Sequence, residues 1–179
     1  MFRPSQEDES VFFRPDQVRR YARHILLPDV GGVGQKRFLT ASVVIEVGPG
    51  CAAEMVALTY LAAAGVGNLV LSGDLRGAVD RRDVRDGIVF AATDIGRERI
   101  DAIAERIQAI NPDVAVTAVD ESDDKSNARP LAGPVQLDVA GGPPIDFGRQ
   151  LEYSVADALV SGGLRAVRTL YEILSHEPA

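Results

Sequence analysis

Residues 44–54 read VIEVGPGCAAE, in which a run of strand-forming residues meets a glycine-rich turn and then helix-forming residues. In a dinucleotide-binding fold, the first glycine of such a turn directs the chain from strand to helix. The second lets backbone N–H groups approach phosphates at the positive end of the helix. Gly48 and Gly50 occupy these two places, whereas Ala53 stands where a third glycine is usual. The stretch therefore predicts a strand–turn–helix unit of the dinucleotide-binding type.

The residues around this turn favour two different interpretations. Pro49 has no N–H and removes one possible phosphate donor. Glu54 places a negative charge in the first helical turn, which suits the helix dipole but competes with a phosphate there. An acidic residue about 20 positions further on would bind a ribose, and Asp74 fits that place. Taken alone, the motif leaves ligand binding and a purely structural turn as open alternatives.

Strand and helix patterns alternate on both sides of the turn. SVVIEV at 42–47 is a continuous β-branched run, which predicts a strand buried on both faces. Further strands are predicted at 68–72, 114–119 and 135–140, and helices at 52–64, 97–110 and 151–175. Strands that alternate with helices imply βαβ units and a parallel sheet. We predict an α/β, Rossmann-like three-layer domain with a mostly parallel sheet.

Two helical patterns have a particular bearing on the packing. The final helix carries an apolar set on one face: Ala156, Val160, Leu164, Val167, Tyr171 and Leu174. Near the start of the chain, apolar residues recur at helical spacing from Asp16, and residues 30–41 form a glycine-rich bend and a short amphipathic piece. We divide the chain into a flexible leader (1–15), a helical N-terminal arm (16–41) and the Rossmann-like domain (42–179).

Composition narrows the class of protein. The chain has 179 residues, of which 46% are hydrophobic and 25% charged, as expected for one folded domain. A net charge of −7 argues against a broad surface for nucleic acid. The single cysteine, Cys51, provides neither a disulfide nor a CxxC zinc pair. With no signal-peptide pattern and no apolar run long enough for a bilayer, we expect a cytoplasmic protein without a metal site or membrane partner.

The stretch RRYARHILLPDVGGVGQKRFLTASVVIEVGPG (19–50) closely resembles the opening of the ThiF/MoeB/HesA family. The similarity continues through 60–74, 94–116 and 136–142. By this resemblance, the fold is that of proteins that adenylate the C-terminal glycine of ubiquitin-like sulfur-carrier proteins, with ATP and magnesium. The same family includes relatives of ubiquitin-activating enzymes.

This chain departs from the family at positions used for ATP chemistry. The lysine of the family's DxGxxK pattern corresponds to Arg99, which keeps the charge but not the shape. The family's SNLxRQ block has no convincing match within 79–87. Alignments place Asp83 or Asp86 there, and an aspartate that faces a triphosphate repels it. The metal-side aspartate of the family corresponds to Gly141, which offers magnesium no ligand.

The resemblance also assigns what remains of the site and of the C-terminal region. GGLRAVRTLYEIL (162–174) resembles the family's final helix and follows directly after the fourth strand, so the 42–179 domain is expected to lack the crossover, zinc and carrier-binding region. Arg23 matches the arginine that family dimers lend to the neighbouring subunit's ATP site. The alternative is that Arg23 lies on a solvated helix face. The remnant nucleotide site is predicted from four residues: Gly48, Gly50, Asp74 and Arg99.

Three functions follow as hypotheses. The first is a truncated, degenerate and non-adenylating family member that needs no cofactor. It would act as a scaffold or partner subunit, in a homodimer or in a heterodimer with a full-length ThiF/MoeB relative. The second is a minimal ATP-dependent adenylyltransferase of a ubiquitin-like sulfur-carrier protein. The third is an NAD-dependent oxidoreductase that uses the glycine turn and Asp74, although no catalytic acid–base pair is evident.

Overall fold

A computed structural model describes residues 12–48, 52–86, 88–119, 136–138 and 155–175. Its strands form one sheet in the order β3-β2-β1-β4, and each neighbouring pair is parallel. The strands are β1 (Ser42–Val47), β2 (Asn68–Gly73), β3 (Ala115–Ala118) and β4 (Gln136–Asp138). This order matches the first four strands of the Rossmann order 3-2-1-4-5-6, and the predicted α/β class is confirmed.

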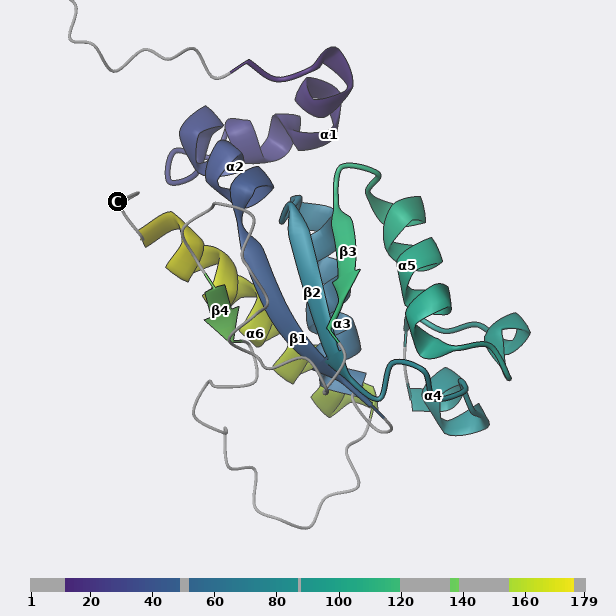
Figure 1. The fold of residues 1–179 in the computed structure, drawn as a ribbon. Helices are drawn as coiled ribbons and strands as arrows, with labels where there is room; N and C mark the ends of the chain where they lie inside the picture. Colours follow the sequence, from purple (N-terminus) through teal and green to yellow (C-terminus); the bar gives the residue numbers. More distant parts are fainter. Residues whose placement is uncertain (1–11, 49–51, 87, 120–135, 139–154, 176–179) are drawn as a thin grey trace, which may run out of the picture.

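The helices alternate with the strands as the sequence predicted (Figure 1). They are α1 (Pro15–Ile25), α2 (Gly31–Thr40), α3 (Ala52–Ala64), α4 (Arg81–Asp86), α5 (Arg99–Ile110) and α6 (Val155–Ser175), with a short 3-10 turn, η1 (Ala92–Asp94). The segment 73–96, for which no helix was predicted, holds both α4 and η1. The helices α1 and α2 lie beyond the amino ends of β1 and β2, whereas α4 lies near their carboxyl ends (Figure 1).

β1 is buried on one face and not on both, which corrects the expectation from its β-branched run. Val43, Ile45 and Val47 are buried, whereas the residues between them are half-buried or, at Glu46, exposed. The core on the buried face draws residues from α3, α5 and α6. Figure 1 shows α3 and α6 behind the strands. Because β1 alternates in burial, its β-branched run reflects strand propensity more than two-sided packing.

The final helix packs with a different face from the one its apolar pattern suggested. Ala166 and Ile173 are buried in the core, and Gly162 lies so close to α3 that a Cβ there would be 2.3 Å from the carbonyl oxygen of Ala53. Four of the expected packing residues are instead exposed, namely Val160, Leu164, Val167 and Tyr171, whereas Leu174 of the same set is half-buried against the core. Small residues on the opposite face let α6 approach α3 closely, and this decides the orientation.

The arm is fastened to the domain through a buried tyrosine. The Tyr21 side chain is fully buried, and its hydroxyl donates to Asp113 Oδ2 at 3.0 Å. Asn111 Nδ2 donates to the Tyr21 hydroxyl at 2.9 Å and to the Ala62 carbonyl at 2.8 Å. Gly65, with φ +86°, gives the ring its room, since a Cβ there would lie 2.6 Å from Tyr21 Cε1.

A second buried contact joins α1, α2 and α3. Gln35 is fully buried, and its Nε2 donates to the Ala64 carbonyl at 3.0 Å. Its Oε1 lies 2.9 Å from His24 Nδ1. Because the amide nitrogen already donates to a carbonyl, Oε1 must accept, and His24 must carry a proton on Nδ1. His24 is thereby part of the contact that holds α1 on α2.

Candidate functional site

The predicted residues Gly48 and Asp74 lie at the same edge of the sheet. Gly48 directly follows β1, and the Asp74 N–H donates to the Val47 carbonyl at 2.8 Å. Gly73 makes this approach possible: its φ is +90°, and a Cβ would lie 2.3 Å from the Val47 carbonyl oxygen. In open α/β sheets, ligands bind outside this carboxyl edge. The predicted Gly50 lies outside the described residues.

At this edge Arg99 is held between two carboxylates. Arg99 begins α5, and its side chain is only 4% exposed. Its Nη1 lies 2.7 Å from Asp74 Oδ2, and its Nη2 lies 3.0 Å from Asp83 Oδ2. The Asp83 side chain is 5% exposed, whereas that of Asp74 is 51% exposed. We call these three residues the arginine–aspartate triad.

The acceptors on Asp74 are occupied on both sides. Oδ2 receives Arg99, and Oδ1 accepts the Gly77 N–H at 3.0 Å. Gly77 has no side chain to disturb the arrangement, because a Cβ there would lie 2.2 Å from Arg99 Nη1. A ribose hydroxyl that approached Asp74 would have to share its oxygens with these two bonds. Asp74 is therefore in the place predicted for a ribose ligand but is already engaged by its own chain.

Asp83 reaches the triad through the start of α4. Asp80 precedes the helix, and its Oδ1 accepts the N–H groups of Arg82 and Asp83 at 2.6 and 3.0 Å. Asp83 Oδ2 in turn accepts the Asp80 N–H at 2.9 Å, which completes a reciprocal capping pair. The bonds from the Asp83 and Arg82 N–H groups hold the pKa of Asp80 below its ordinary value. The same capping pair fixes Asp83 against Arg99.

The triad leaves one polar atom unsatisfied. Arg99 Nε is buried and has no hydrogen-bond partner among the described residues. Both terminal nitrogens already donate to carboxylates, and the Arg99 side chain is only 4% exposed, so a phosphate reaches the guanidinium only if the side chains around it move. Moving Asp83 away would leave a pair of opposite charges unpaired away from water, which is costly. The described residues of this edge therefore do not fit a nucleoside triphosphate in the way the family resemblance implies.

Glu54, at the start of α3, has a partner of its own. Its Oε1 forms an ion pair with Arg165 Nη1 of α6. Its charge therefore faces a cation of the same chain and helps to hold α6 on α3. Pro49 and Cys51 in the same turn lie outside the described residues.

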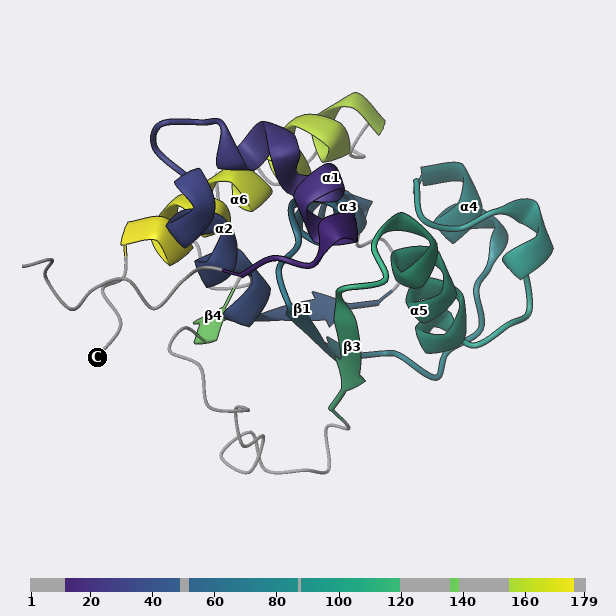
Figure 2. The same cartoon turned by 90° about the horizontal axis from the view of Figure 1, so that it is seen from above.

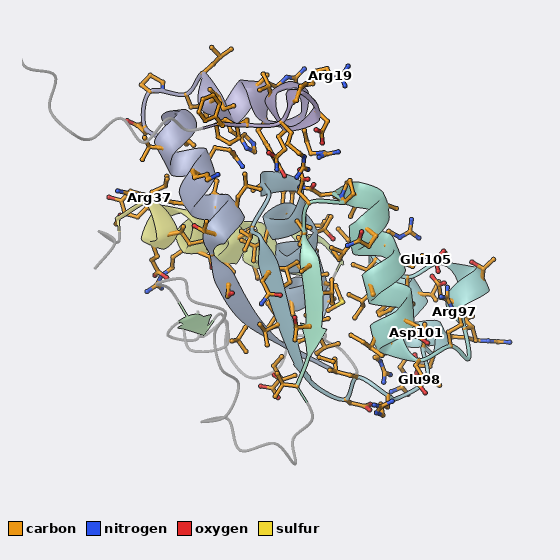
Figure 3. All side chains as sticks on the ribbon, turned by 45° about the horizontal axis from the view of Figure 1, so that its top comes forward. Arg19, Arg37, Arg97, Glu98, Asp101 and Glu105 are labelled. Carbon is orange, nitrogen blue, oxygen red and sulfur yellow. The ribbon has the colours of Figure 1, made fainter. Side chains whose placement is uncertain are left out.

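Arg23 is exposed and lies at the other end of the molecule from the triad. It belongs to α1, beyond the amino ends of the strands, and it has no ion pair with any described residue (Figure 1). Figure 3 shows the neighbouring Arg19 on this helix, far from Glu98 and Asp101 at the start of α5. β1 alone separates the two edges by about 20 Å at the usual rise per residue. The structure therefore does not bring Arg23 together with Gly48, Asp74 and Arg99.

The described part of the chain contains no group of three or more His, Cys, Asp or Glu side chains arranged to hold a metal ion. Gly141, which corresponds to the family's metal-side position, falls outside it. None of the described helices has the length and apolar character needed to cross a membrane.

Comparisons with known proteins extend from the arm to the fourth strand. The model of the ThiF family matches residues 21–140. The SAMP-activating enzyme E1 of Haloferax volcanii is 39% identical over 111 residues, which are 62% of this chain and 40% of that protein. The sulfur carrier protein ThiS adenylyltransferase of Escherichia coli is 38% identical over 102 residues, 57% of this chain and 39% of that protein.

A crystal structure of PaaA superposes with a TM-score of 0.70 and covers 94% of this chain and 79% of PaaA. At 18% sequence identity, this likeness concerns the fold alone and confirms the Rossmann-like architecture. The matched part of the chain spans about 40% of the length of these two curated relatives. Because the family model covers the arm, the glycine turn and the sheet, the chain belongs to the ThiF family.

Proposed function

We propose that this protein is a non-adenylating member of the ThiF family that acts as a dimeric scaffold or partner subunit for an active enzyme. The observation that carries the proposal is the arginine–aspartate triad. Arg99 is the cation that the resemblance assigns to phosphate, and it is buried against Asp74 and Asp83. The triad therefore fills the nucleotide edge with contacts inside the chain.

The kind of partner follows from the named relatives. They include an enzyme that activates SAMP and one that adenylates the sulfur carrier ThiS. We propose that the chain forms a homodimer, or a heterodimer with a full-length relative of the same class, and that the active enzyme it serves has a ubiquitin-like sulfur-carrier protein as its substrate. The exposed Arg23 supports this role, because it lies too far from its own carboxyl edge to act there. An exposed arginine in that position can contact another subunit.

The division of the chain is part of the proposal. The arm helices end at Thr40 and β1 begins at Ser42, which supports a boundary between residues 41 and 42. The leader at 1–15, the absence of a carrier-binding region from 42–179 and a cytoplasmic location remain expectations from the sequence.

The decisive experiment is ATP–pyrophosphate exchange with candidate carrier proteins. We expect no exchange above background from this chain alone, and robust exchange from the Escherichia coli ThiS adenylyltransferase as the positive control. Robust exchange by this chain alone would overturn the proposal. Adding this chain to a relative from its own host is expected to change that relative's rate, which tests the partner role directly.

A substitution in the triad tests whether the contacts of Arg99 with the two aspartates prevent ATP from binding. Asp83→Asn removes one of the two carboxylate charges, and we expect calorimetry with ATP and magnesium to show tighter binding than in the wild type. Asp101→Asn is the matched control, because it removes one charge from an exposed position on α5 (Figure 3). Equal binding in both variants would mean that the triad does not close the site.

A minimal adenylyltransferase is the second candidate. It is favoured by the names of the relatives and by the position of Gly48 and Asp74 at the same carboxyl edge. On this hypothesis the wild-type chain binds ATP with magnesium and forms a carrier adenylate without a partner. Calorimetry that detects no binding at millimolar nucleotide would exclude it. The named relatives give no support to the oxidoreductase hypothesis.

A further inference from the structure

Helix α4 connects two segments that are anchored to α5 and to the turn before it. Ahead of α4, the Val79 N–H donates to the Arg97 carbonyl at 2.9 Å, and the Val79 carbonyl accepts the Gly96 N–H at 2.9 Å. After α4, Val89 is buried, and its carbonyl accepts a bond of 3.0 Å from Arg106 Nε. Figure 1 and Figure 2 show α4 at the periphery of the molecule, on the side of α5 and away from α2. The helix is therefore a short excursion between two fixed points of the chain.

Helix α4 is held more by charge than by apolar packing. None of its described side chains belongs to the fully buried apolar core, and Val84 packs only partly against it. Arg81, Arg82 and Arg85 are exposed, whereas the Asp83 side chain is 5% exposed. A helix of six residues is not stable by itself in water. The position of α4 therefore depends on the contact of Asp83 with Arg99 and on the cap at Asp80.

Asp83 uses only part of the donor set that Arg99 offers. A guanidinium group presents Nε and Nη2 side by side, and one oxyanion can accept from both through two parallel bonds. Asp83 Oδ2 accepts from Arg99 Nη2 at 3.0 Å, whereas Nε is buried and has no partner among the described residues. The same Oδ2 accepts the Asp80 N–H at 2.9 Å, which ties the carboxylate to the cap of α4. The contact therefore lacks one of the two bonds that an external oxyanion would make.

The other side of the guanidinium has a partner that does not belong to α4. Arg99 Nη1 donates to Asp74 Oδ2 at 2.7 Å, and the Gly77 N–H holds the second oxygen of Asp74 at 3.0 Å. If α4 moves outward, Arg99 keeps this ion pair, and Asp83 is carried into water with its helix. An oxyanion that takes the place of Asp83 leaves no charge unpaired away from water. The exchange thus avoids the main cost of breaking the triad.

We propose that α4 is a movable plug. A phosphate-type oxyanion displaces Asp83 from Arg99 and binds Nε and Nη2 together, while α4 swings outward between its two fixed ends. Without such an anion, the Asp83 carboxylate takes its place and keeps the carboxyl edge closed. The inference rests on the proposed function and deepens it, because it states how the closed edge of a non-adenylating protein opens.

Hydrogen exchange of the full chain, measured by mass spectrometry with inorganic pyrophosphate as the probe, follows α4 directly. We expect pyrophosphate at about 10 mM to speed exchange in peptides that cover α4 by roughly threefold or more, because it shifts the population toward the open position. Sodium chloride of the same ionic strength is the control and should have a smaller effect. Unchanged or slower exchange in α4 on addition of pyrophosphate would overturn the proposal.

Arg99→Lys tests the donor pair. Lysine keeps the positive charge but has no side-by-side Nε and Nη2, so the response of α4 to pyrophosphate should disappear. Circular dichroism confirms that this variant is folded. A response as large as that of the wild type would mean that the paired donors of Arg99 are not the anion site.

Two substitutions of Asp80 separate the position of α4 from the charge near Arg99. Asp80→Ala removes the cap of α4, whereas Asp80→Asn removes the same charge and keeps a capping side chain. Because the lost cap weakens the closed position, calorimetry should show roughly fivefold tighter binding of pyrophosphate by Asp80→Ala than by Asp80→Asn. Equal affinities in two folded variants would show that the position of α4 does not control access to Arg99.

The two proposals fail separately. If α4 does not respond and the chain shows no ATP–pyrophosphate exchange, the movable plug is wrong and the non-adenylating role stands. If α4 responds and the chain alone shows robust exchange, the plug stands and the non-adenylating role is wrong.

Discussion

Arginine–carboxylate contacts lie at both ends of the sheet, but they satisfy the buried polar atoms to different extents. At the amino end, Asp113 is 4% exposed and is held by Arg14, Arg20 and Tyr21. At the carboxyl end, Arg99 is held by Asp74 and Asp83, but its Nε lacks a partner among the described residues. Buried polar groups in a settled structural contact are normally all paired. We call the contacts of Tyr21 and Asp113 with Asn111, Arg14 and Arg20 the arm network. It therefore has the character of a purely structural contact, whereas the triad has the character of a former functional site.

The largest effect is expected from breaking the triad. Arg99→Ala leaves the buried Asp83 carboxylate without its cation and should lower the free energy of unfolding by about 3 kcal/mol. Urea denaturation measures this change. Asp101→Ala on the exposed side of the same helix serves as the control, with an effect within about 0.5 kcal/mol. A near-neutral Arg99→Ala would show that the triad carries little of the stability.

Alanine substitutions at two glycines compare the rigidity of the two ends of the sheet. Gly65→Ala combines a φ of +86° with a Cβ 2.6 Å from the fixed Tyr21 ring, and it should cost about 3 kcal/mol. Gly77→Ala brings its Cβ against Arg99 Nη1 and Asp74 Oδ2, which are the ends of flexible side chains. It should cost only about 1 kcal/mol. Thermal unfolding of both variants tests the order, and the reverse order would mean that the triad is the more rigid end.

Removal of the Tyr21 hydroxyl tests how much its hydrogen bonds contribute to the stability of the arm network. Tyr21→Phe removes one hydrogen bond from Asn111 and one from Asp113, and it should lower stability by about 2 kcal/mol. Tyr60→Phe, at a residue that is 53% exposed, is the matched control and should be neutral. Should both variants unfold at the same urea concentration, the arm would be held by packing alone.

The smallest effect concerns the dependence of stability on pH. Burial alone would raise the pKa of Asp113, but the bonds from Tyr21, Arg14 and Arg20 outweigh it and leave the pKa below its ordinary value. Its contribution to stability is therefore complete above the unfolded pKa of about 3.9 and is lost as pH falls through the lower folded pKa. The difference in thermal midpoint between wild type and Asp113→Asn should shrink on acidification. A constant difference would contradict the assignment.

Sequence patterns predicted the order and type of the main elements because strand and helix periodicities are local properties. β1, α3 and β2 lie within a few residues of the predicted limits. The mistakes concern burial. The runs at 42–47 and in α6 identified apolar residues, but not which side would be covered, since that depends on distant segments. In α6, Gly162 and Ala166 determine the packing face, and neither stands out by hydrophobicity.

The candidate site, too, could be predicted only where local patterns determine it. Gly48 and Asp74 were placed at one edge correctly, because the carboxyl ends of adjacent parallel strands meet. The contact of Arg99 with Asp83 depends on the start of α4, a helix that was not predicted. One signal was present: aspartates at 80 and 83 have the spacing of a capping pair. The link from Tyr21 to Asp113 spans 92 positions and has no counterpart in local patterns.

The buried Tyr21 also gives the protein a spectroscopic reporter. The chain has four tyrosines and no tryptophan, so its ultraviolet emission comes from tyrosine alone. Tyr21 bonds a carboxylate in a dry environment, whereas Tyr60 and Tyr171 are exposed. Release of the arm would free the Tyr21 hydroxyl from Asp113 and change its emission without unfolding the sheet. Fluorescence of a variant that keeps Tyr21 as its sole tyrosine would therefore follow the docking of the arm in real time.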